Sequence, residues 1–175
     1  AYGALLHDVG KIGVPEAILN KQGPLDAAET VLMHKHVEIG LKILGNIEVL
    51  RDVLPLVKYH QERWDGKREG VVYPGYFGLR GENIPLGARI LSVIDALDAI
   101  TNDRPYRKGR DMAQALAELE REAGAQFDPR VVAVLRELLE REPELLAGPR
   151  PASVFDSGAL RISSARSASA IAGAG

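Results

Sequence analysis

Hydrophobic residues recur with helical spacing along most of the chain, and this pattern predicts a protein built from α-helices. No stretch shows the alternation of apolar and polar residues that is typical of a half-buried strand. The pattern predicts the end of a buried helix at 4–6, a short helix within 12–22, and longer helices at 26–45, 53–60, 85–101, 111–123 and 129–142. We therefore expect an all-α fold.

Aspartates stand where several of these helices should begin, and each can accept a hydrogen bond from the first turn of its helix. They are Asp26, Asp52, Asp111 and Asp128. Asp26 is followed three residues later by Glu29, and this pair predicts a capping box. Asp128 precedes Pro129, and proline suits the first position of a helix.

Composition and charge narrow the class of protein. The 175 residues suit one domain, which we expect at 1–147. Residues 148–175 are rich in Pro, Ser, Ala and Gly with little apolar periodicity, which predicts a disordered tail. The net charge of -2 gives no reason to expect a nucleic-acid polymer as partner. Because the chain has no cysteine, any metal ion must be held by nitrogen and oxygen atoms.

Targeting signals are absent from the sequence. No apolar run approaches the roughly 20 residues that a membrane-spanning helix needs, and no signal peptide is visible. We therefore expect a cytoplasmic domain, or a domain on the cytosolic side of a larger protein. Because the chain starts within what looks like the end of a helix, we also expect that an upstream segment is missing.

The most informative stretch is His7-Asp8-Val9-Gly10-Lys11. Adjacent His and Asp side chains can offer a nitrogen and a carboxylate oxygen to one pocket, and a carboxylate can bridge two cations. Gly10 allows a sharp turn or a close backbone approach, and Lys11 could bring an ammonium to an anionic substrate. The alternative is that Gly10 only caps a helix C-terminus and that Lys11 is solvated.

His36 is a second ligand candidate, on the inward face of the 26–45 helix. Gly40 lies four residues later on the same face and leaves room beside the ring. A hydrogen-bonded core histidine is the alternative interpretation of His36. His34 is two positions away, so it should point elsewhere and be exposed.

His60 and two aspartates complete the candidate ligands. His60 is expected at a helix end, and Asp95 and Asp98 share a face of the 85–101 helix close to its apolar face. A carboxylate there needs a cation, a hydrogen-bond donor or a metal. A helical bundle would let these side chains converge. Nitrogen and carboxylate ligands without thiolate favour Fe, Mn or Zn, and a bridging Asp8 favours two ions.

Two further segments suit substrate binding. Arg104 and Arg107 lie in a compact basic turn after the 85–101 helix, and arginine can grip a phosphate with two hydrogen bonds. Residues 66–85 form a long segment filled with Gly, Pro and aromatic residues, and such loops are usually functional or mobile. Its aromatic side chains could stack on a base or pin the loop to the core.

The order of these motifs resembles that of the HD-GYP family, cyclic-dinucleotide phosphodiesterases within the HD-domain superfamily. The resemblance extends from residue 1 to about 139. The matching motifs are His7-Asp8-x-Gly10-Lys11, His36-x-x-x-Gly40, His60-Gln61-Glu62-x-Trp64-Asp65-Gly66, Ile84-Pro85-x-x-Ala88-Arg89-Ile90, Asp95-x-x-Asp98-Ala99-x-Thr101-x-Asp103-Arg104-Pro105-Tyr106-Arg107 and Gln126-Phe127-Asp128-Pro129.

This resemblance implies an HD-domain helical bundle with a metal centre of two divalent ions in its core, Fe or Mn being expected. By the resemblance, one ion would be bound by His7, Asp8 and Asp95. The second ion would be bound by Asp8, His36 and His60.

The resemblance also implies an activity and the residues that serve it. Asp8 and Lys11 would take part in catalysis, while Lys11, Arg104 and Arg107 would hold the substrate phosphates. The reaction would be hydrolysis of cyclic di-GMP, or of cyclic GMP-AMP, to a linear dinucleotide or GMP. An upstream sensor or receiver domain would accompany the domain, and the 66–85 loop could bind protein partners.

Three features depart from the family pattern. Gln61 stands where a second histidine is usual, so the second ion should bind more weakly or differently. The Gly-Tyr-Pro signature is displaced by an insertion and appears as Val72-Tyr73-Pro74, which leaves Tyr73 as a candidate substrate contact. A further histidine, and often a glutamate, would lie upstream of the first residue.

These departures leave two other functions open. The first is a degenerate domain that binds a nucleotide or a partner protein without turnover. The second is a general HD-superfamily phosphohydrolase that acts on mononucleotides, although the basic turn at 104–107 resembles that of the dinucleotide enzymes more closely.

Overall fold

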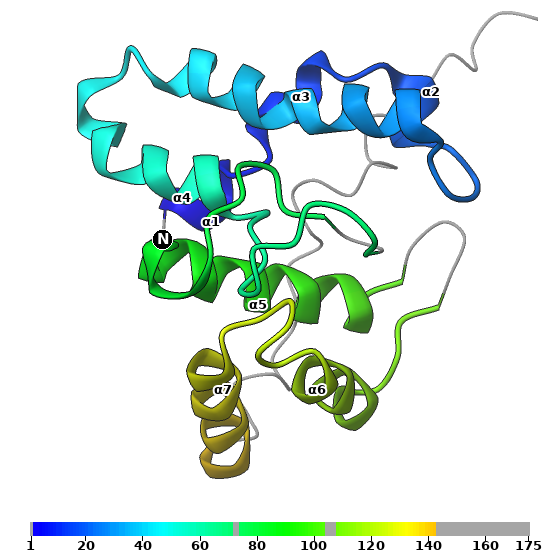
Figure 1. Cartoon of the computed structure of the whole chain (residues 1–175), viewed down its shortest axis with the longest axis vertical. Coiled ribbons are helices and arrows are strands. Elements are labelled where there is room, and N and C mark those ends of the chain that lie inside the picture. The colour runs from blue at the N-terminus through cyan, green and yellow to red at the C-terminus, as the bar shows by residue number, and fades with distance from the viewer. Residues whose placement is uncertain (1, 72–73, 104–107, 143–175) are drawn as a thin grey trace, which may run out of the picture.

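The computed structural model describes residues 2–71, 74–103 and 108–142 (Figure 1). Within these ranges there is no β-strand, and the predicted all-α fold is confirmed. The elements are α1 (Tyr2–Leu6), the 3-10 helix η1 (Val9–Gly13), α2 (Glu16–Leu19), α3 (Ala27–Leu44), the 3-10 helix η2 (Glu48–Val53), α4 (Leu54–Tyr59), the 3-10 helix η3 (Gly81–Asn83), α5 (Leu86–Thr101), α6 (Met112–Arg121) and α7 (Pro129–Arg141).

Several predictions concern residues outside the described part of the chain. They are the substrate contacts Tyr73, Arg104 and Arg107 and the tail at 148–175. The division into a domain at 1–147 and a tail stays a prediction.

Helix α5 divides the molecule into two parts. In the view of Figure 1, α3 runs along the top with α4 and α1 beneath it, α5 crosses the middle, and α6 and α7 lie below. The lower part is closed by a hydrophobic cluster between α5, α6 and α7, formed by Val93, Leu97, Ala115, Leu119, Phe127, Val132 and Leu135. The upper part carries the histidines and packs around the buried side chains Val37, Leu44, Val57 and Ala88.

Most of the predicted helix starts are confirmed. The side chain of Asp26 accepts a hydrogen bond from the N–H of Glu29, whose own side chain accepts one from the N–H of Asp26, which is the capping box. Asp111 and Asp128 cap α6 and α7 through the N–H groups of Gln114 and Arg130. These caps satisfy backbone donors that the first turn of a helix leaves free.

The prediction for Asp52 is wrong. Residues 48–53 form a 3-10 turn that runs into α4, so α4 begins one residue later than predicted and Val53 occupies its N-cap position without a side-chain hydrogen bond. Pro55 lies in the first turn of α4, where a missing N–H costs nothing. The helix at 4–6 is also less buried than its apolar residues predict, because Leu5 is 54% exposed.

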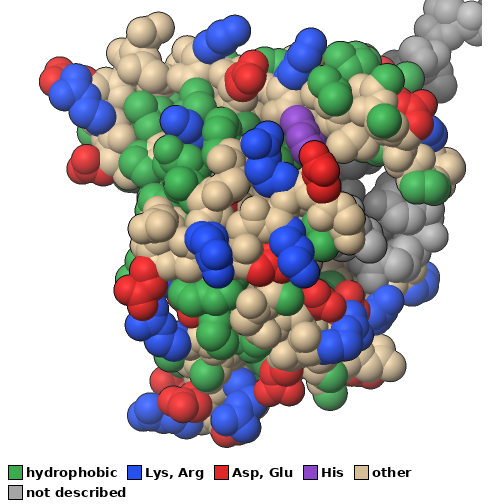
Figure 2. All heavy atoms as spheres, in the orientation of Figure 1, with side chains coloured by type: hydrophobic (Ala, Val, Ile, Leu, Met, Phe, Trp, Pro, Cys, Tyr) green, Lys and Arg blue, Asp and Glu red, His purple; other side chains and the backbone are tan. Residues whose placement is uncertain are grey.

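Neither the overall hydropathy of the described helices nor the distribution of charged residues on the face shown in Figure 2 is unusual. Among the described residues, no helix is long and apolar enough to cross a membrane. Figure 2 shows Lys and Arg side chains interspersed with Asp and Glu over the face in view. This mixture agrees with the small net charge of the whole chain.

Candidate metal centre

The His-Asp pair lies at a sharp change of direction between α1 and η1. His7 follows the last residue of α1, and Asp8 is the N-cap residue of η1. Gly10 then lies against the middle of α3, where a Cβ atom would come within 1.8 Å of the carbonyl oxygen of His36. Only glycine permits this approach. Because Gly10 lies inside η1, the alternative that it caps a helix C-terminus is wrong.

The three cluster histidines are oriented in the same way. The Nδ1 atoms of His7, His36 and His60 lie 2.8, 2.7 and 2.9 Å from the carbonyl oxygens of Ala4, Met33 and Val57, each three residues earlier. A carbonyl oxygen only accepts, so Nδ1 carries the proton in each ring. The lone pair of a neutral ring is therefore on Nε2, the atom left to bind a ligand.

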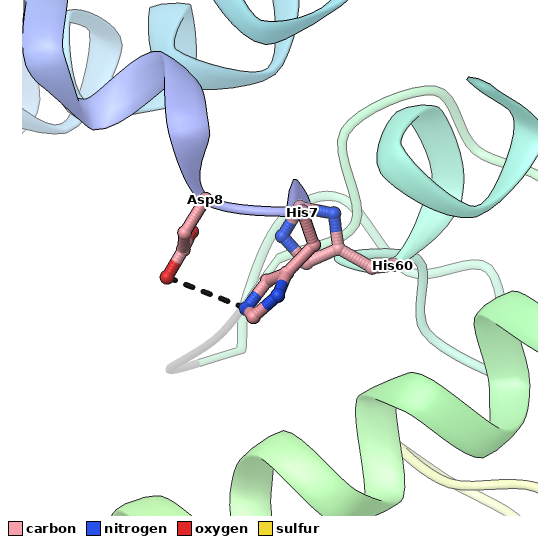
Figure 3. Close-up of side chains that lie close together, drawn as sticks. All are labelled: His7, Asp8 and His60. Carbon is pink, nitrogen blue, oxygen red and sulfur yellow. Dashed lines mark ion pairs between the residues drawn. The ribbon is translucent and has the colours of Figure 1, made fainter. Parts of the chain in front are cut away.

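The free ring nitrogens converge on the carboxylate of Asp8. The Nε2 atom of His7 lies 3.3 Å from Oδ2 of Asp8, and the Nε2 atom of His36 lies 3.5 Å from Oδ1. His60 joins them, since ligand atoms of His7, Asp8 and His60 all lie within 4.8 Å of one another (Figure 3). The chain thus brings together side chains from the ends of α1 and α4 and from the middle of α3.

The cluster has the donor atoms of a cation site. Among the described residues, four buried side-chain atoms lack a hydrogen-bond partner, namely Nε2 of His7, His36 and His60 and Oδ1 of Asp8. Leaving one such atom unpaired costs about 1–3 kcal/mol. In a neutral ring Nε2 carries a lone pair, as a carboxylate oxygen does, so one or two cations at the centre would satisfy all four atoms together. Imidazole nitrogen with carboxylate oxygen suits Fe, Mn or Zn.

Asp95 extends the cluster from α5, and Asp98 does not. Oδ1 of Asp95 lies 3.6 Å from Nε2 of His7. Asp98 is exposed and accepts a hydrogen bond from the side chain of Asn102. The two carboxylates were predicted to share a face, and the structure shows that only the first reaches the histidines.

The electrostatics of the cluster favour positive charge at its centre. Burial alone would lower the pKa of His7, but the carboxylates of Asp8 and Asp95 outweigh it and raise this pKa to about 10. Burial would raise the pKa of Asp8, but His7 and Lys11 hold it far below its usual range. Burial lowers the pKa of His60 to about 4 and also lowers that of His36, so these two rings stay neutral at physiological pH.

Lys11 lies beside the cluster as predicted. Its Nζ atom donates to Oδ2 of Asp8 at 2.5 Å, one turn along η1, and its side chain is 40% exposed. The ammonium therefore lies at the rim of the cluster, between the carboxylate and solvent. The alternative of a fully solvated lysine is wrong.

Glu62 has a structural role that the sequence did not predict. Its buried carboxylate accepts hydrogen bonds from the N–H groups of Tyr76, Phe77 and Leu79 at 2.7, 2.6 and 2.7 Å. The side chain of Glu62, two residues after His60, thus holds residues 76–79 of the 66–85 loop. The available signal was a carboxylate two residues after His60 combined with a loop whose backbone donors have no helix to join.

A second set of motif residues fixes the near end of the loop. Trp64 and Asp65 donate their N–H groups to the carbonyls of Gln126 and Ala125. Arg89 lies over the ring of Trp64 at 5.7 Å and donates to the buried carboxylate of Asp128 at 2.5 Å. These residues link α5 and the start of α7 to the segment that follows His60.

Tyr76 brings the loop to the edge of the cluster. Its ring stacks on His34 with centroids 3.7 Å apart and meets the ring of His36 edge-on at 6.1 Å. The prediction that His34 is simply exposed is therefore wrong, because the loop folds back over α3 and half buries it. Burial, and the negative charge of Asp8, raise the pKa of Tyr76 well above its usual range.

The structure thus brings five predicted ligands together in one cluster: His7, Asp8, His36, His60 and Asp95. Gln61 follows His60 at the end of α4 and is half-buried, and its role as a ligand stays a prediction.

The sequence matches a known family over most of its length. The family described as "HD domain" matches residues 1–131. The chain belongs to the HD domain family.

Curated relatives place this HD domain near cyclic-dinucleotide enzymes. A "3'3'-cGAMP-specific phosphodiesterase 2" of Vibrio cholerae is 37% identical over 134 residues, covering 75% of this chain and 24% of the relative. A cyclic di-GMP phosphodiesterase of Pseudomonas aeruginosa is 43% identical over 128 residues, covering 73% of this chain and 29% of the relative. The chain thus spans about a quarter to a third of the length of these relatives. Together these matches confirm the resemblance to the HD-GYP family.

A solved structure supports the fold alone. The crystal structure of a cyclic GMP-AMP phosphodiesterase from V. cholerae aligns with a TM-score of 0.55 at 19% identity, covering 82% of this chain and 39% of that chain. The predicted HD-type helical bundle is therefore confirmed.

Proposed function

We propose that the protein is a metal-dependent phosphodiesterase that hydrolyses a cyclic dinucleotide, cyclic di-GMP or cyclic GMP-AMP, to a linear dinucleotide or GMP. The observation that carries this proposal is the convergence of four unpartnered buried atoms from His7, Asp8, His36 and His60. The names of the relatives supply the substrate class. An upstream sensor or receiver domain, as the resemblance implies, would regulate this activity.

The distances around Asp8 support part of the ligand assignment that the family resemblance implies. Asp8 lies between the histidines, with Oδ2 near His7 and Oδ1 near His36, so its two oxygens suit a carboxylate that bridges two ions. Following the resemblance, we assign His7 and Asp95 to one ion and His36 and His60 to the other. The rings of His36 and His60 lie 5.6 Å apart, and His60 lies equally near His7, at 5.0 Å between ring centroids. Fe or Mn fits this nitrogen and oxygen set.

The groups around the cluster would divide the work of hydrolysis between metal binding and phosphate binding. Bound divalent cations would activate a water molecule and stabilise charge on the phosphoryl oxygens. The backbone carbonyls behind the three histidines hold the rings in the tautomer that a ligand needs. Lys11 is exposed enough to reach a phosphate oxygen while it stays anchored near Asp8. Arg104 and Arg107 would hold the same phosphates, as the sequence predicts.

A nucleotide-binding domain without turnover is the second candidate. The observation that favours it is the insertion in the 66–85 loop, together with Gln61 in place of a histidine. Such a domain would retain the ligand cluster and bind the dinucleotide. It would not hydrolyse the dinucleotide.

The test combines metal analysis with turnover. Anaerobically purified protein should contain Fe or Mn, and it should convert cyclic di-GMP or cyclic GMP-AMP when either metal is added. Asp95→Asn should lower metal content and rate, whereas Asp98→Asn on the same helix should leave both unchanged, because Asp98 faces solvent. Metal with dinucleotide binding and no turnover would establish the second candidate, and protein that binds no divalent metal would refute both.

A further inference from the structure

Helix α5 carries an apolar stripe that is open to solvent. Leu86, Ile90 and Ile94 are 56, 45 and 44% exposed, and each follows the one before it by four residues. Residues four apart lie on one row of a helix, so the three side chains form a stripe roughly 12 Å long. Ala88 and Val93, on other faces of α5, are fully buried. The stripe is therefore the apolar face that packing among the described residues leaves open.

Two exposed side chains of α1 lie near one end of the stripe. Tyr2 and Leu5 are 66 and 54% exposed, and they are three residues apart on α1. Leu56 of α4 lies between α1 and α5, because a Cβ atom on Gly3 would come within 2.6 Å of its side chain and one on Gly87 within 3.1 Å. Helix α1 therefore lies beside the N-terminal end of α5 (Figure 1). Several large apolar side chains exposed together indicate a contact surface.

The stripe is symmetrical about Ile90, and this symmetry favours a second copy of the same chain as its partner. Two copies of α5 that run in opposite directions would place Ile90 against Ile90 of the second copy, and Leu86 against Ile94. A dimer with a two-fold axis needs such self-complementarity, because both copies contribute the same surface. Packing between rows of residues four apart is also the commonest way in which two helices meet.

The charges at the two ends of the stripe also suit an antiparallel pair. Asp98 is exposed one turn after Ile94, and Glu82 lies four residues before Leu86. Oε1 of Glu82 accepts a hydrogen bond from Arg130 at 2.6 Å, and the side chain of Arg130 is 65% exposed. In an antiparallel pair, Asp98 of one copy would meet this Glu82–Arg130 pair of the other, where the arginine can bind both carboxylates. A parallel pair would instead bring Asp98 against Asp98, and like charges oppose association.

We propose that the stripe, with Tyr2 and Leu5 at its edge, is the interface of a homodimer in which two copies of α5 cross antiparallel at Ile90. Ile90 and Asp95 are five residues apart and so point about 140° apart around α5, which means that the candidate metal centre faces away from the interface. A stable interface of standard size contains about 20–30 residues on each side. The stripe and its edge supply far fewer, so the dimer should be weak, with a dissociation constant above about 1 μM.

Sedimentation equilibrium of the 175-residue chain measures the dimer directly. The average mass should rise from 18.9 kDa toward twice this value as the concentration increases from about 1 to 500 μM. Ile90→Lys should raise the dissociation constant at least about 30-fold, because it places two ammonium groups against each other in an apolar contact. Val134→Lys on α7 is the matched control, since Val134 is 64% exposed and lies outside the stripe, and it should dimerise as the wild type does.

Cross-linking tests the orientation and needs only conservative substitutions. The chain has no cysteine, so each single-cysteine variant carries one thiol. Packed helices lie about 8–10 Å apart, which is too far for a direct disulfide, so a short bismaleimide is the suitable reagent. Ile90→Cys should link to itself. Leu86→Cys should link when mixed with Ile94→Cys and not with itself, and Val134→Cys should not link.

The outcomes decide the dimer separately from the proposed function. A wild-type chain that stays at 18.9 kDa at every concentration overturns the dimer, and so does association that Val134→Lys disrupts and Ile90→Lys does not. If the chain is monomeric and the thiol of Ile90→Cys resists a simple maleimide, another part of the same chain covers the stripe, which also overturns the dimer. Metal content and turnover of Ile90→Lys should equal those of the wild type. A wild-type dimer without turnover would refute the proposed function alone.

Discussion

Replacing Gly10 by alanine should damage the protein more than the addition of one methyl group to the interior ordinarily would. The added Cβ would lie 1.8 Å from the carbonyl oxygen of His36 and 2.5 Å from the backbone nitrogen of Gly40. Cβ atoms are essentially never found within 3.0 Å of such atoms, so η1 must move away from α3 by at least 3.0 − 1.8 = 1.2 Å. Both partners are backbone atoms in the interior of a helix and cannot rotate aside.

This displacement has consequences for stability and for metal binding. Overpacking in a well-packed interior costs about 1–3 kcal/mol, and the backbone contact places Gly10→Ala at the upper end, about 3 kcal/mol. That corresponds to a fall in Tm of roughly 10 °C for a domain of this size. Asp8, two residues earlier, would move with η1, and its Oδ1 atom is 3.5 Å from Nε2 of His36. Metal affinity should therefore fall together with stability.

Gly40→Ala is the matched control, since the two glycines face each other across the same contact. A Cβ on Gly40 would meet its nearest neighbours at 3.5, 3.5 and 3.6 Å, which is ordinary van der Waals contact. Alanine is also favoured over glycine inside a helix by about 0.5–1 kcal/mol. Gly40→Ala should therefore be neutral or stabilising. Urea denaturation and calorimetric titration with Mn²⁺ measure both effects. Equal stability and affinity in Gly10→Ala and the wild type would refute the close packing.

Three further predictions test the loop, the charge of the cluster and the second ion. Glu62→Gln should lower the free energy of unfolding by about 1–3 kcal/mol and speed hydrogen exchange at the N–H of Leu79, because an amide NH2 would face the N–H that Oε2 accepts from in the wild type. Unchanged exchange at Leu79 would contradict the anchoring role. Because the pKa of His7 is about 10 and a ligand must lose its proton, Mn²⁺ binding near pH 7 should release about one proton from His7, and the affinity should increase as the pH rises toward about 10. Calorimetry in buffers of different ionisation enthalpy measures the proton release, and no release would refute His7 as a ligand. Gln61→His should raise occupancy of the second ion in elemental analysis, and unchanged occupancy would place Gln61 outside the site.

The parts of the fold that local sequence determines could be predicted. Asp26, Asp111 and Asp128 cap helices because their side chains meet the backbone only two or three residues away. Asp52 failed as a cap because the 3-10 turn at 48–53 joins α4 without a break, and the spacing of apolar residues does not distinguish such a turn from the start of a helix.

The ligand cluster could be predicted from the sequence, whereas the contacts of the 66–85 loop could not. His36 and Asp95 could be placed inward because helical spacing assigns each residue to a face. The contacts of Tyr76 and Glu62 could not be predicted, because residues 66–85 have no period that says where a side chain points. The same limit explains the error at His34, whose burial comes from the loop and not from the helix that carries it.

The motif residues divide into those that face the cluster and those that hold neighbouring segments in place. Asp128 is buried and paired with Arg89, so removing either partner would leave the other charge uncompensated in the interior, at a cost of about 3–5 kcal/mol. Trp64 stands four residues after His60. Its ring lies beneath Arg89, and its backbone N–H donates a hydrogen bond to the carbonyl of Gln126. Helix α5 and the residues before α7 therefore hold the residues that follow His60, and Glu62 among them in turn holds the backbone of Tyr76. Changes at Arg89 or Asp128 should reach the metal centre through that segment, although neither side chain touches it.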